Sequence, residues 1–438
     1  MTAPRLPQEI YIGTAGPKHL AAFCAARLGL GGRACGAVLR LVADSASWAA
    51  RSPGAEPGAE CKLGPEVERE LRAMGVATRA TIYTEASLAA DARSVFRLLI
   101  DADANEQLYV AIGSGTITDI VRFACHRTGR DFVSLATAPS VDAFASVVAP
   151  VLVDGIKVSV PAAAPLAVFA DTEALALAPR PMIAAGFGDM LCKFSAVADW
   201  RLGALLWRET FDETIARRSQ AAARACVEAV AAIGAAEPGG LATLMGALVE
   251  SGLCMAQAGH SRSASGAEHQ YSHYWEMRLL AEGRPPILHG LKVGIGTIEA
   301  ARLWDVVRGM DEAEASARLA RSALPDRAAE EANIRGAYAG AADIGAVIAG
   351  QERFLSMSSP DYQELKHEIR RRWREIRALA STVPSAAETA KLLAVAGCPT
   401  DACALGLGRR ETVIGLEHAH YVRDRFTVKK LARLLAIA

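Results

Sequence analysis

Residues 108–125 read LYVAIGSGTITDIVRFAC, and this stretch decides the fold class. The apolar run Leu108–Ile112 predicts a buried strand, and Val121–Cys125 predicts the continuation of a helix, so the glycines between them lie in a strand-to-helix turn. Such a turn lets a phosphate approach the backbone, where the helix N-terminus offers N–H donors and a positive dipole end. However, Gly113-Ser114-Gly115 lacks the later glycine of the usual dinucleotide fingerprint. A structural turn fits this segment as well as a nucleotide site does.

Up to about residue 178, short β-rich runs alternate with helical stretches. The expected strands are Glu9–Ile12, Ala37–Val42, Ala80–Tyr83, Leu108–Ile112, Phe132–Leu135 and Ala167–Phe169. Because most of the intervals suit crossover helices, the pattern predicts a parallel sheet covered on both faces. Val151–Val153 and Ile156–Val160 flank Asp154-Gly155, which predicts one antiparallel hairpin.

Beyond Pro179–Pro181 the β signal nearly vanishes. Helices are expected over 212–234, 241–259, 309–322 and 361–380. The sequence therefore predicts an α/β nucleotide-binding domain over residues 1–178 and a helical, metal-binding domain over residues 179–438. We expect the active site in a cleft between the two.

Composition narrows the class of protein. The 438 residues include 48 Lys plus Arg and 48 Asp plus Glu, so nothing favours a polyanion-binding surface, although a local basic pocket for one phosphate remains compatible. The nine cysteines are scattered and contain no CxxC pair, which favours a reducing compartment over a disulfide framework. With no signal peptide and no apolar run long enough for a membrane span, we expect a cytoplasmic protein that binds no nucleic acid.

Two further segments place polar side chains near expected element ends. ATAPSVD (136–142) follows the strand Phe132–Leu135, and ligands bind at the carboxyl ends of strands in open α/β sheets. Thr137, Ser140 and Asp142 are therefore candidate contacts. AGFGDMLCK (185–193) places Asp189 after Gly-x-Gly at the start of the helical half. In both segments the acidic residue could instead cap a helix.

Four of the nine histidines lie between residues 260 and 289. His269 and His273 are four residues apart, so on a helix their imidazoles lie on one face, and a loop or helix start could bring His289 alongside. Zinc and similar ions use histidine nitrogen with carboxylate oxygen. Gln270 stands where the protease motif HExxH has glutamate, so that motif is excluded. A chance pair at this spacing remains an alternative to a metal site.

Six motifs in order resemble the sn-glycerol-1-phosphate dehydrogenase family, within the larger group of iron-containing alcohol dehydrogenases, glycerol dehydrogenases and dehydroquinate synthases. They are GSGTITDIVRF (113–123), ATAPSVDAFAS (136–146), VLVDGIKVSVPA (151–162), AGFGDMLCKFSAVADW (185–200), SGAEHQYSHYWEM (265–277) and LHGLKVGIGT (288–297). The resemblance covers about residues 8–300 and implies a Rossmann-like nucleotide domain, an all-α C-terminal helical domain and an active site between them.

The resemblance also implies site residues. In that family one Asp and two His hold a divalent ion, zinc or in bacterial members nickel, and these carry over to Asp189, His269 and His289. His273 and Asp142 match catalytic positions that contact substrate, as Asp189 also would. NAD or NADP would contact Asp44, Gly113, Ser114, Gly115, Thr116, Ile117, Asp119, Thr137, Ala138, Pro139, Ser140 and Ser146. Lys157, Lys193 and Arg262 are candidates for holding a substrate phosphate.

The chain departs from the family pattern at Ala143, where the family usually has Gly, and at Leu291, where relatives commonly have Glu. The leading function is interconversion of dihydroxyacetone phosphate and sn-glycerol 1-phosphate by hydride transfer at C2. The alternatives are a dehydrogenase of another polyol, polyol phosphate or ketone, and a non-enzymatic nucleotide-binding relative. A homo-oligomer is also expected.

Overall fold

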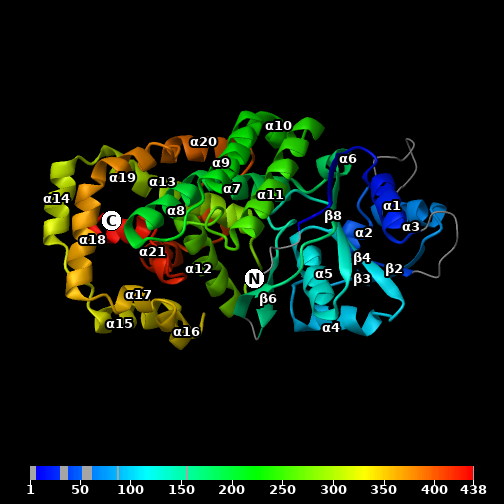
Figure 1. Ribbon diagram of the computed structural model, residues 1–438, viewed down its shortest axis with the longest axis horizontal. Coiled ribbons are helices and arrows are strands. Elements are labelled where there is room, and N and C mark those ends of the chain that lie inside the picture. Colours follow the sequence, from blue (N-terminus) through cyan, green and yellow to red (C-terminus); the bar gives the residue numbers. More distant parts are fainter. Residues whose placement is uncertain (1–5, 30–37, 52–61, 86–87, 154–155, 438) are drawn as a thin grey trace. The chain divides into compact units, whose positions relative to one another are not determined.

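The computed structural model describes residues 6–29, 38–51, 62–85, 88–153 and 156–437. Contacts divide the chain into two compact units (Figure 1). The N-terminal unit comprises Met1–Phe187 and Glu228–Gly259, and the C-terminal unit comprises Gly188–Val227 and His260–Ala438. Each unit therefore contains two separate stretches of chain. The predicted domain boundary after residue 178 stays a prediction.

A six-stranded parallel sheet forms the centre of the N-terminal unit. Its strands lie in the order β1-β8-β5-β4-β2-β3, and a separate pair, β6 and β7, is antiparallel. The bounds are β1 Glu9–Gly13, β2 Val38–Asp44, β3 Ala77–Tyr83, β4 Glu106–Gly113, β5 Asp131–Ala136, β6 Val148–Val153, β7 Ile156–Pro161 and β8 Ala167–Asp171. The predicted parallel sheet and hairpin are confirmed. The expected turn Asp154-Gly155 lies outside the described residues, as does Ala37.

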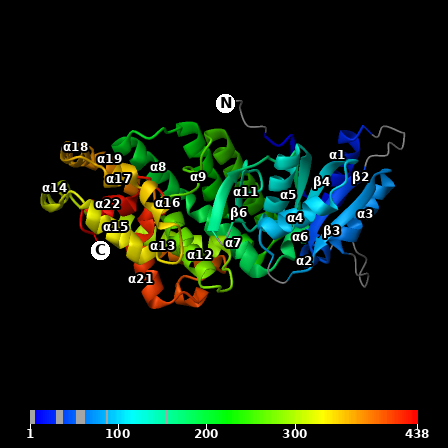
Figure 2. The same cartoon turned by 90° about the horizontal axis from the view of Figure 1, so that it is seen from below.

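Helices cover both faces of this sheet. Along β4, Leu108, Val110 and Ile112 belong to one apolar cluster, whereas Tyr109 and Ala111 belong to another. This alternation follows from the two-residue period of a strand, and it lets one strand build two cores. Helices α1 (Gly16–Arg27) and α3 (Leu63–Ala73) complete the first cluster, and α4 (Ala92–Asp101) and α5 (Gly115–Thr128) complete the second (Figures 1 and 2).

The remaining helices of the N-terminal unit are α2 (Ser45–Trp48), α6 (Thr172–Ala176), most of α7 (Arg180–Leu191), α10 (Val230–Ala235) and α11 (Pro238–Ala258). Among the described residues, α11 alone is long and apolar enough to cross a membrane, and most of its apolar window is buried inside the protein. It packs against α6, α10 and β1. Its apolar composition is therefore that of a core helix.

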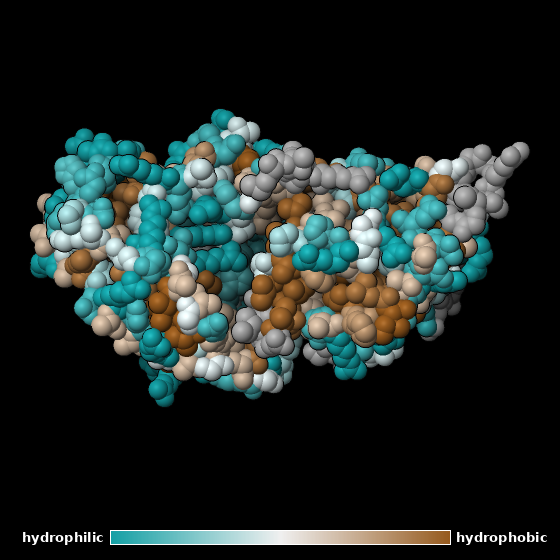
Figure 3. All heavy atoms as spheres, turned by 60° about the horizontal axis from the view of Figure 1, so that its bottom comes forward, coloured by the Kyte–Doolittle hydropathy of each residue, from teal (hydrophilic) through white to brown (hydrophobic). Residues whose placement is uncertain are grey.

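One surface of the N-terminal unit is apolar. Phe96 and Ile100 on α4 are 64% and 67% exposed, and Val153 at the end of β6 is 48% exposed. Figure 3 shows hydrophobic side chains gathered over α4 and the β6–β7 hairpin. These side chains contribute little to the core of the unit itself.

The regular secondary structure of the C-terminal unit, in its described residues, consists of helices without a strand. Its helices are α8 (Lys193–Trp207), α9 (Glu213–Glu228), α12 (Ala267–Ala281), α13 (His289–Gly309), α14 (Glu312–Arg321), α15 (Arg327–Tyr338), α16 (Ile344–Ala349), α17 (Glu352–Leu355), α18 (Ser359–Arg371), α19 (Trp373–Ala380), α20 (Ala386–Val395), α21 (Arg409–His418) and α22 (Val428–Leu434), with 3-10 turns η1 (Cys403–Leu405) and η2 (Ala419–Tyr421). Helix α13 packs against α8, α12, α19, α20 and α22. Around it Trp275, Trp304 and Trp373 are fully buried.

The expected elements differ from the observed ones mainly at their ends. The stretch 212–234 is two helices, because the chain leaves helical geometry at Ala229 between α9 and α10. The stretch 361–380 is divided in the same way at Arg372. Strand β3 begins at Ala77, three residues before the expected start, because its pairing with β2 extends past its apolar part.

Candidate active site

Three predicted metal ligands from separate segments meet in the C-terminal unit. Asp189 lies near the end of α7, His269 in the first turn of α12, and His289 is the first residue of α13. Their ligand atoms all lie within 4.8 Å of one another, and His269 Nε2 is 3.7 Å from Asp189 Oδ1. The first two side chains are buried and the third is half-buried. The structure therefore brings one carboxylate and two imidazoles together.

Two glycines allow the three helices to approach this closely. A Cβ atom at Gly188 would lie 2.4 Å from the carbonyl oxygen of Gly290, which follows His289. A Cβ atom at Gly296 would lie 2.4 Å from the carbonyl oxygen of Glu268, which precedes His269. Neither contact is tolerable for a larger residue, so both positions need glycine. Backbone packing next to each ligand thus holds the cluster together.

Glu268 orients His269. Its Oε1 lies 3.1 Å from His269 Nδ1 and accepts a 2.6 Å hydrogen bond from the Gly266 N–H, while Oε2 accepts one of 2.8 Å from Ser195. A carboxylate on one ring nitrogen fixes the tautomer of a ligating histidine, which leaves the other nitrogen as the ligand atom. Burial raises the pKa of Glu268, and its hydrogen bonds lower it. The arrangement turns Nε2 toward Asp189.

Lys193 lies one helical turn after Asp189 and is fully buried. Its Nζ is 3.5 Å from Asp189 Oδ1 and donates to the carbonyl oxygen of Ala264 at 3.3 Å. A buried carboxylate is costly unless a positive charge or hydrogen bonds compensate it. Lys193 therefore supports the charge of Asp189 from inside the core, a position that does not favour its predicted role in holding a substrate phosphate.

A second group of donors shares one residue with the first. Cys192, Glu268 and His269 also have ligand atoms within 4.8 Å of one another. However, the Cys192 thiol donates to the carbonyl oxygen of Asp189 at 3.1 Å, and both Glu268 oxygens already accept hydrogen bonds. These bonds make the second group a support for the first cluster.

His273 lies beside the cluster, one turn beyond His269 on α12. Its ring centroid is 5.8 Å from that of His269 and 5.6 Å from that of His289. Burial, with smaller contributions from Arg423 and the two histidines, lowers its pKa well below the usual value, while a contact with Glu276 raises it. A neutral imidazole at pH 7 has one nitrogen that can accept a proton and one N–H that can donate a hydrogen bond, which suits a candidate for contact with a substrate hydroxyl.

The chemistry of the cluster fits a divalent transition ion. Two imidazole nitrogens and one carboxylate oxygen match the donors of catalytic zinc sites, in which three protein ligands leave a further position for substrate. Hard and borderline donors of this kind also suit nickel.

The predicted nucleotide residues gather at one edge of the parallel sheet. Gly113 ends β4, next to Asp44 at the end of β2 and Ala136 at the end of β5. The Thr137 N–H donates to the carbonyl oxygen of Gly113 at 3.2 Å, and the Thr137 hydroxyl lies 3.4 Å from that of Ser47. Three carboxyl ends therefore share one edge, where open α/β sheets bind ligands.

Helix α5 begins at this edge with Gly115. Its N-cap residue, Ser114, makes no side-chain capping bond, so the side chain does not satisfy the N–H groups of the first turn. The same first turn contains Thr116 and Ile117. An uncapped helix start of this kind fits the pyrophosphate of a dinucleotide.

Several predicted cofactor residues have structural partners. Asp44 caps α2 through a 2.7 Å bond from the Ser47 N–H. Asp119 pairs at 2.9 Å with the buried Arg122. Ser146 accepts a 3.0 Å bond from the Val148 N–H at the start of β6. Their roles as cofactor contacts stay predictions.

The remaining candidates lie in the loop after β5. Ala138 and Ser140 are buried, and the Ser140 N–H donates to the carbonyl oxygen of Ala138 at 3.0 Å. The carbonyl oxygen of Pro139, between them, would lie 1.8 Å from a Cβ atom at Gly186. Asp142 accepts a 2.8 Å hydrogen bond from the Ser251 hydroxyl on α11. It therefore belongs to the N-terminal unit, and its substrate contact also stays a prediction.

The sequence pattern predicted no role for Glu268, and it did not predict that Lys193 points toward Asp189. The signal for Glu268 was its position next to His269, which by itself is too common to interpret. The side chain of Lys157 lies outside the described residues. Arg262, the third phosphate candidate, forms a 2.7 Å ion pair with Glu209.

Comparison with known proteins gives the family. A family model described as iron-containing alcohol dehydrogenase matches residues 55–179. A protein of Bacillus velezensis named glycerol-1-phosphate dehydrogenase [NAD(P)+] is 38% identical over 363 residues, which cover 82% of this chain and 78% of that protein. The chain belongs to the glycerol-1-phosphate dehydrogenase family. A protein of Geobacillus thermodenitrificans with the same name is 42% identical over 208 residues. This match covers 48% of this chain and 52%, about half, of that protein.

Solved structures support the same fold for this member of the glycerol-1-phosphate dehydrogenase family. Glycerol dehydrogenase from Schizosaccharomyces pombe is similar with a TM-score of 0.58 at 14% identity, over 99% of this chain and 89% of that one. At this identity the likeness concerns the fold alone. It confirms the predicted combination of a Rossmann-like α/β region with a helical region.

Proposed function

We propose that this protein is a metal-dependent NAD(P) oxidoreductase that interconverts dihydroxyacetone phosphate and sn-glycerol 1-phosphate. The observation that carries the proposal is the meeting of Asp189, His269 and His289 in a chain of this family. Relatives that are named for this reaction support the substrate.

Asp189, His269 and His289 would hold the ion. A divalent zinc or nickel ion supplies Lewis acidity, which stabilises negative charge on the C2 oxygen of the substrate. Glu268 keeps His269 in the ligating orientation, and Lys193 supports the charge of Asp189. Asp189 and His273 are the side chains that we assign to substrate contact from this unit.

The sheet edge of the N-terminal unit would bind the dinucleotide. The N–H groups at the start of α5 would bind its pyrophosphate, and Asp44 and Thr137 lie at the neighbouring strand ends for the rest of the cofactor. When bound there, NADH or NADPH would supply the hydride for C2 and become oxidised, and the protein would have to provide a path for the one proton that the C2 oxygen takes up.

His273 is the group that we assign to proton transfer. It lies within one helical turn of His269 and is 23% exposed, which leaves a route from solvent. Its lowered pKa keeps the ring neutral at pH 7, so that one nitrogen can accept the hydroxyl proton in the direction of alcohol oxidation. We also keep Asp142 as a proposed substrate contact.

The deciding experiment is stereochemical. Purified protein of known ion content reduces dihydroxyacetone phosphate with NADH or NADPH, and the enantiomer of the product is determined. We expect sn-glycerol 1-phosphate. Formation of the sn-3 enantiomer would contradict the proposal. Faster reduction of unphosphorylated dihydroxyacetone would instead favour a polyol dehydrogenase.

We also propose that the protein acts in the cytoplasm as a homo-oligomer. The exposed apolar side chains of α4, Phe96 and Ile100, support an interface there. Light scattering after size-exclusion chromatography should give a multiple of 46.1 kDa, and Phe96→Glu should reduce it. A monomeric mass for the unaltered protein would contradict the oligomer.

A further inference from the structure

Two arginines from the C-terminal end of the chain lie against the loop that leads into α12. Arg423 and Arg425 belong to the segment between η2 and α22. Arg425 Nη1 donates to the carbonyl oxygen of Ser265 at 2.7 Å, and its Nη2 donates to Ser261 Oγ at 3.0 Å. Arg423 Nη1 donates to the same Ser261 oxygen at 3.1 Å. Two guanidinium groups thus lie side by side on one acceptor oxygen.

This pair lies close to the candidate metal cluster within the same unit. Gln270, the residue after His269, donates from Nε2 to the carbonyl oxygen of Arg423 at 3.4 Å. The Oε1 atom of Gln270 accepts a 3.2 Å hydrogen bond from Thr427. Arg423 is also one of the charges that lower the pKa of His273. The segment is therefore fixed to α12, the helix that carries His269 and His273.

The charges of Glu209 and Glu268 act on Arg425 from a distance, but they form no ion pair with it. Among the residues that the structure describes, neither Arg423 nor Arg425 forms an ion pair, whereas Arg262 beside them is held by Glu209 at 2.7 Å. Asp199, the other nearby carboxylate, accepts hydrogen bonds from the backbone instead. Burial and the charges of Arg423 and Arg262 lower the pKa of Arg425 to about 9. Two half-buried cations held together in this way favour an anion between them.

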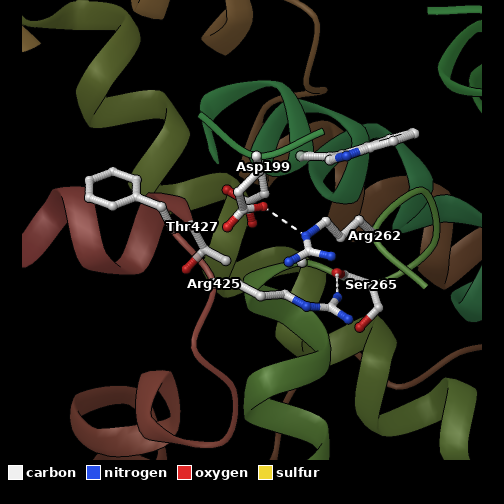
Figure 4. A pocket seen from close by; sticks show the side chains of 9 residues that line it. Asp199, Arg262, Ser265, Arg425 and Thr427 are labelled. Carbon is white, nitrogen blue, oxygen red and sulfur yellow. Dashed lines mark hydrogen bonds and ion pairs between the residues drawn. The ribbon is translucent and has the colours of Figure 1, made fainter. Parts of the chain in front are cut away.

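The pocket around Arg425 shows how the pair is supported. Its lining includes Asp199, Arg262, Ser265 and Thr427 (Figure 4). Figure 4 shows the Arg262 and Arg425 side chains entering it from opposite segments, with Ser265 beside Arg425. In this pocket Arg262 is ion-paired with Glu209, whereas Arg425 makes hydrogen bonds to Ser261 and Ser265 and, among the described residues, no ion pair.

We infer that Arg423 and Arg425 bind the phosphate group of the substrate, with the Ser261 hydroxyl marking the position of one phosphate oxygen. The inference rests on the proposed function and names the residues that would restrict it to phosphorylated substrates. Guanidinium groups bind phosphate oxygens through two N–H groups at once, so two of them suit a dianionic phosphate. The pair lies outside the region in which the sequence resembles the family with confidence.

The test compares phosphorylated and unphosphorylated substrate. In Arg423→Met and Arg425→Met, the KM for dihydroxyacetone phosphate should rise about 10- to 100-fold, as expected when a charge-assisted hydrogen bond is lost. Turnover of dihydroxyacetone, the KM for NADPH and the content of bound ion should stay as in the unaltered protein. Inorganic phosphate should inhibit the unaltered protein competitively and inhibit both variants at least about ten times more weakly.

Control variants separate binding from folding. Arg423→Lys keeps the positive charge and should recover part of the affinity for dihydroxyacetone phosphate that Arg423→Met loses. If the two variants have the same melting temperature, this recovery cannot be explained by a purely structural role of Arg423. Arg262→Met should change the KM less, because Glu209 already pairs with Arg262. Arg308→Met removes an arginine that donates to the carbonyl oxygen of Ala380 elsewhere in the unit, and it should leave the KM unchanged.

The outcomes distinguish two failures. If the unaltered protein does not reduce dihydroxyacetone phosphate, the proposed function fails and the phosphate site fails with it. If the unaltered protein does so but the arginine variants lose activity equally on both substrates, or lose none, the function stands and the arginine site is wrong. If either methionine variant fails to fold, Arg423→Lys and the inhibition of the unaltered protein by phosphate decide. The inference is overturned if phosphate does not inhibit the unaltered protein competitively.

Discussion

The candidate metal cluster of the C-terminal unit and the candidate nucleotide site at the sheet edge of the N-terminal unit differ in the groups that form them. The cluster depends on particular side chains, Asp189, His269 and His289, of which Asp189 is supported by Lys193 and His269 by Glu268. The sheet edge depends on backbone, because strand ends and the N–H groups at the start of α5 define it. Replacing a single side chain should therefore abolish ion binding at the candidate metal cluster. At the sheet edge, nucleotide binding should be weakened mainly by substitutions that add charge or bulk.

The largest effect is expected from removal of a ligand. His269→Ala and Asp189→Ala should lower the content of bound ion to background and reduce turnover by roughly 1,000-fold or more, because Lewis acidity is lost with the ion. Elemental analysis and the rate of dihydroxyacetone phosphate reduction give both values. His367→Ala, which changes an exposed histidine on α18, is the matched control and should leave both unchanged. Normal turnover in an ion-free His269→Ala protein would refute the metal site.

A smaller effect is expected one layer outward. Glu268→Gln keeps the shape of the side chain but weakens the hydrogen bond that orients His269, so affinity for the ion should fall about 10- to 100-fold. Competition with a chelator measures that affinity. Unchanged affinity would mean that packing alone orients the imidazole.

The sheet edge should respond to charge instead. Thr116→Asp places a carboxylate in the first turn of α5, which suits the helix dipole but repels a pyrophosphate, so the KM for NADH or NADPH should rise about 10-fold without loss of thermal stability. Thr116→Asn is the neutral control of equal size and should change the KM little. If the two variants behave alike, the start of α5 does not bind the pyrophosphate.

The smallest effect concerns a buried charge outside both sites. Burial lowers the pKa of Lys430 from 10.5 to about 8, despite its contact with Asp424. Between these two values the unfolded chain holds the proton more often than the folded protein, so this lysine makes the free energy of unfolding rise with pH. The unfolding free energy of the unaltered protein minus that of Lys430→Met should increase by roughly 2 kcal/mol from about pH 8 to pH 10. Urea denaturation at several pH values measures both free energies of unfolding. If their difference does not change with pH, Lys430 does not titrate in this range.

The sequence predicts some parts of the fold and of the candidate site better than others. The apolar run Leu108–Ile112 of β4 is unbroken and that of β5 is interrupted only by Ser134, because both faces of the sheet are covered, so these strands could be predicted from the sequence pattern alone. The start of β3 at Ala77 could not, because its first residues are polar or exposed and pair only through the backbone. Likewise, the helical spacing of His269 and His273 indicated one face but gave no reason for Glu268 to be a partner.

Contacts between distant segments account for most of what sequence reasoning missed. Arg423 and Arg425 are separated by about 160 residues from the serines that they contact, and no local pattern marks them. The approach of Gly188 to Gly290 is equally invisible, since each glycine alone is compatible with many roles. Family resemblance supplied the ligand set, and the packing of α7, α12 and α13 gives it a physical basis.

Reconstitution with metal tests the central claim most directly. The purified protein is stripped with a chelator, zinc or nickel is returned in measured steps, and the reduction of dihydroxyacetone phosphate is followed. Activity should be lost on stripping and should return in proportion to added ion until one ion is bound per chain. Full activity in the stripped protein, or recovery that His289→Ala shows equally, would contradict a catalytic ion held by these three side chains.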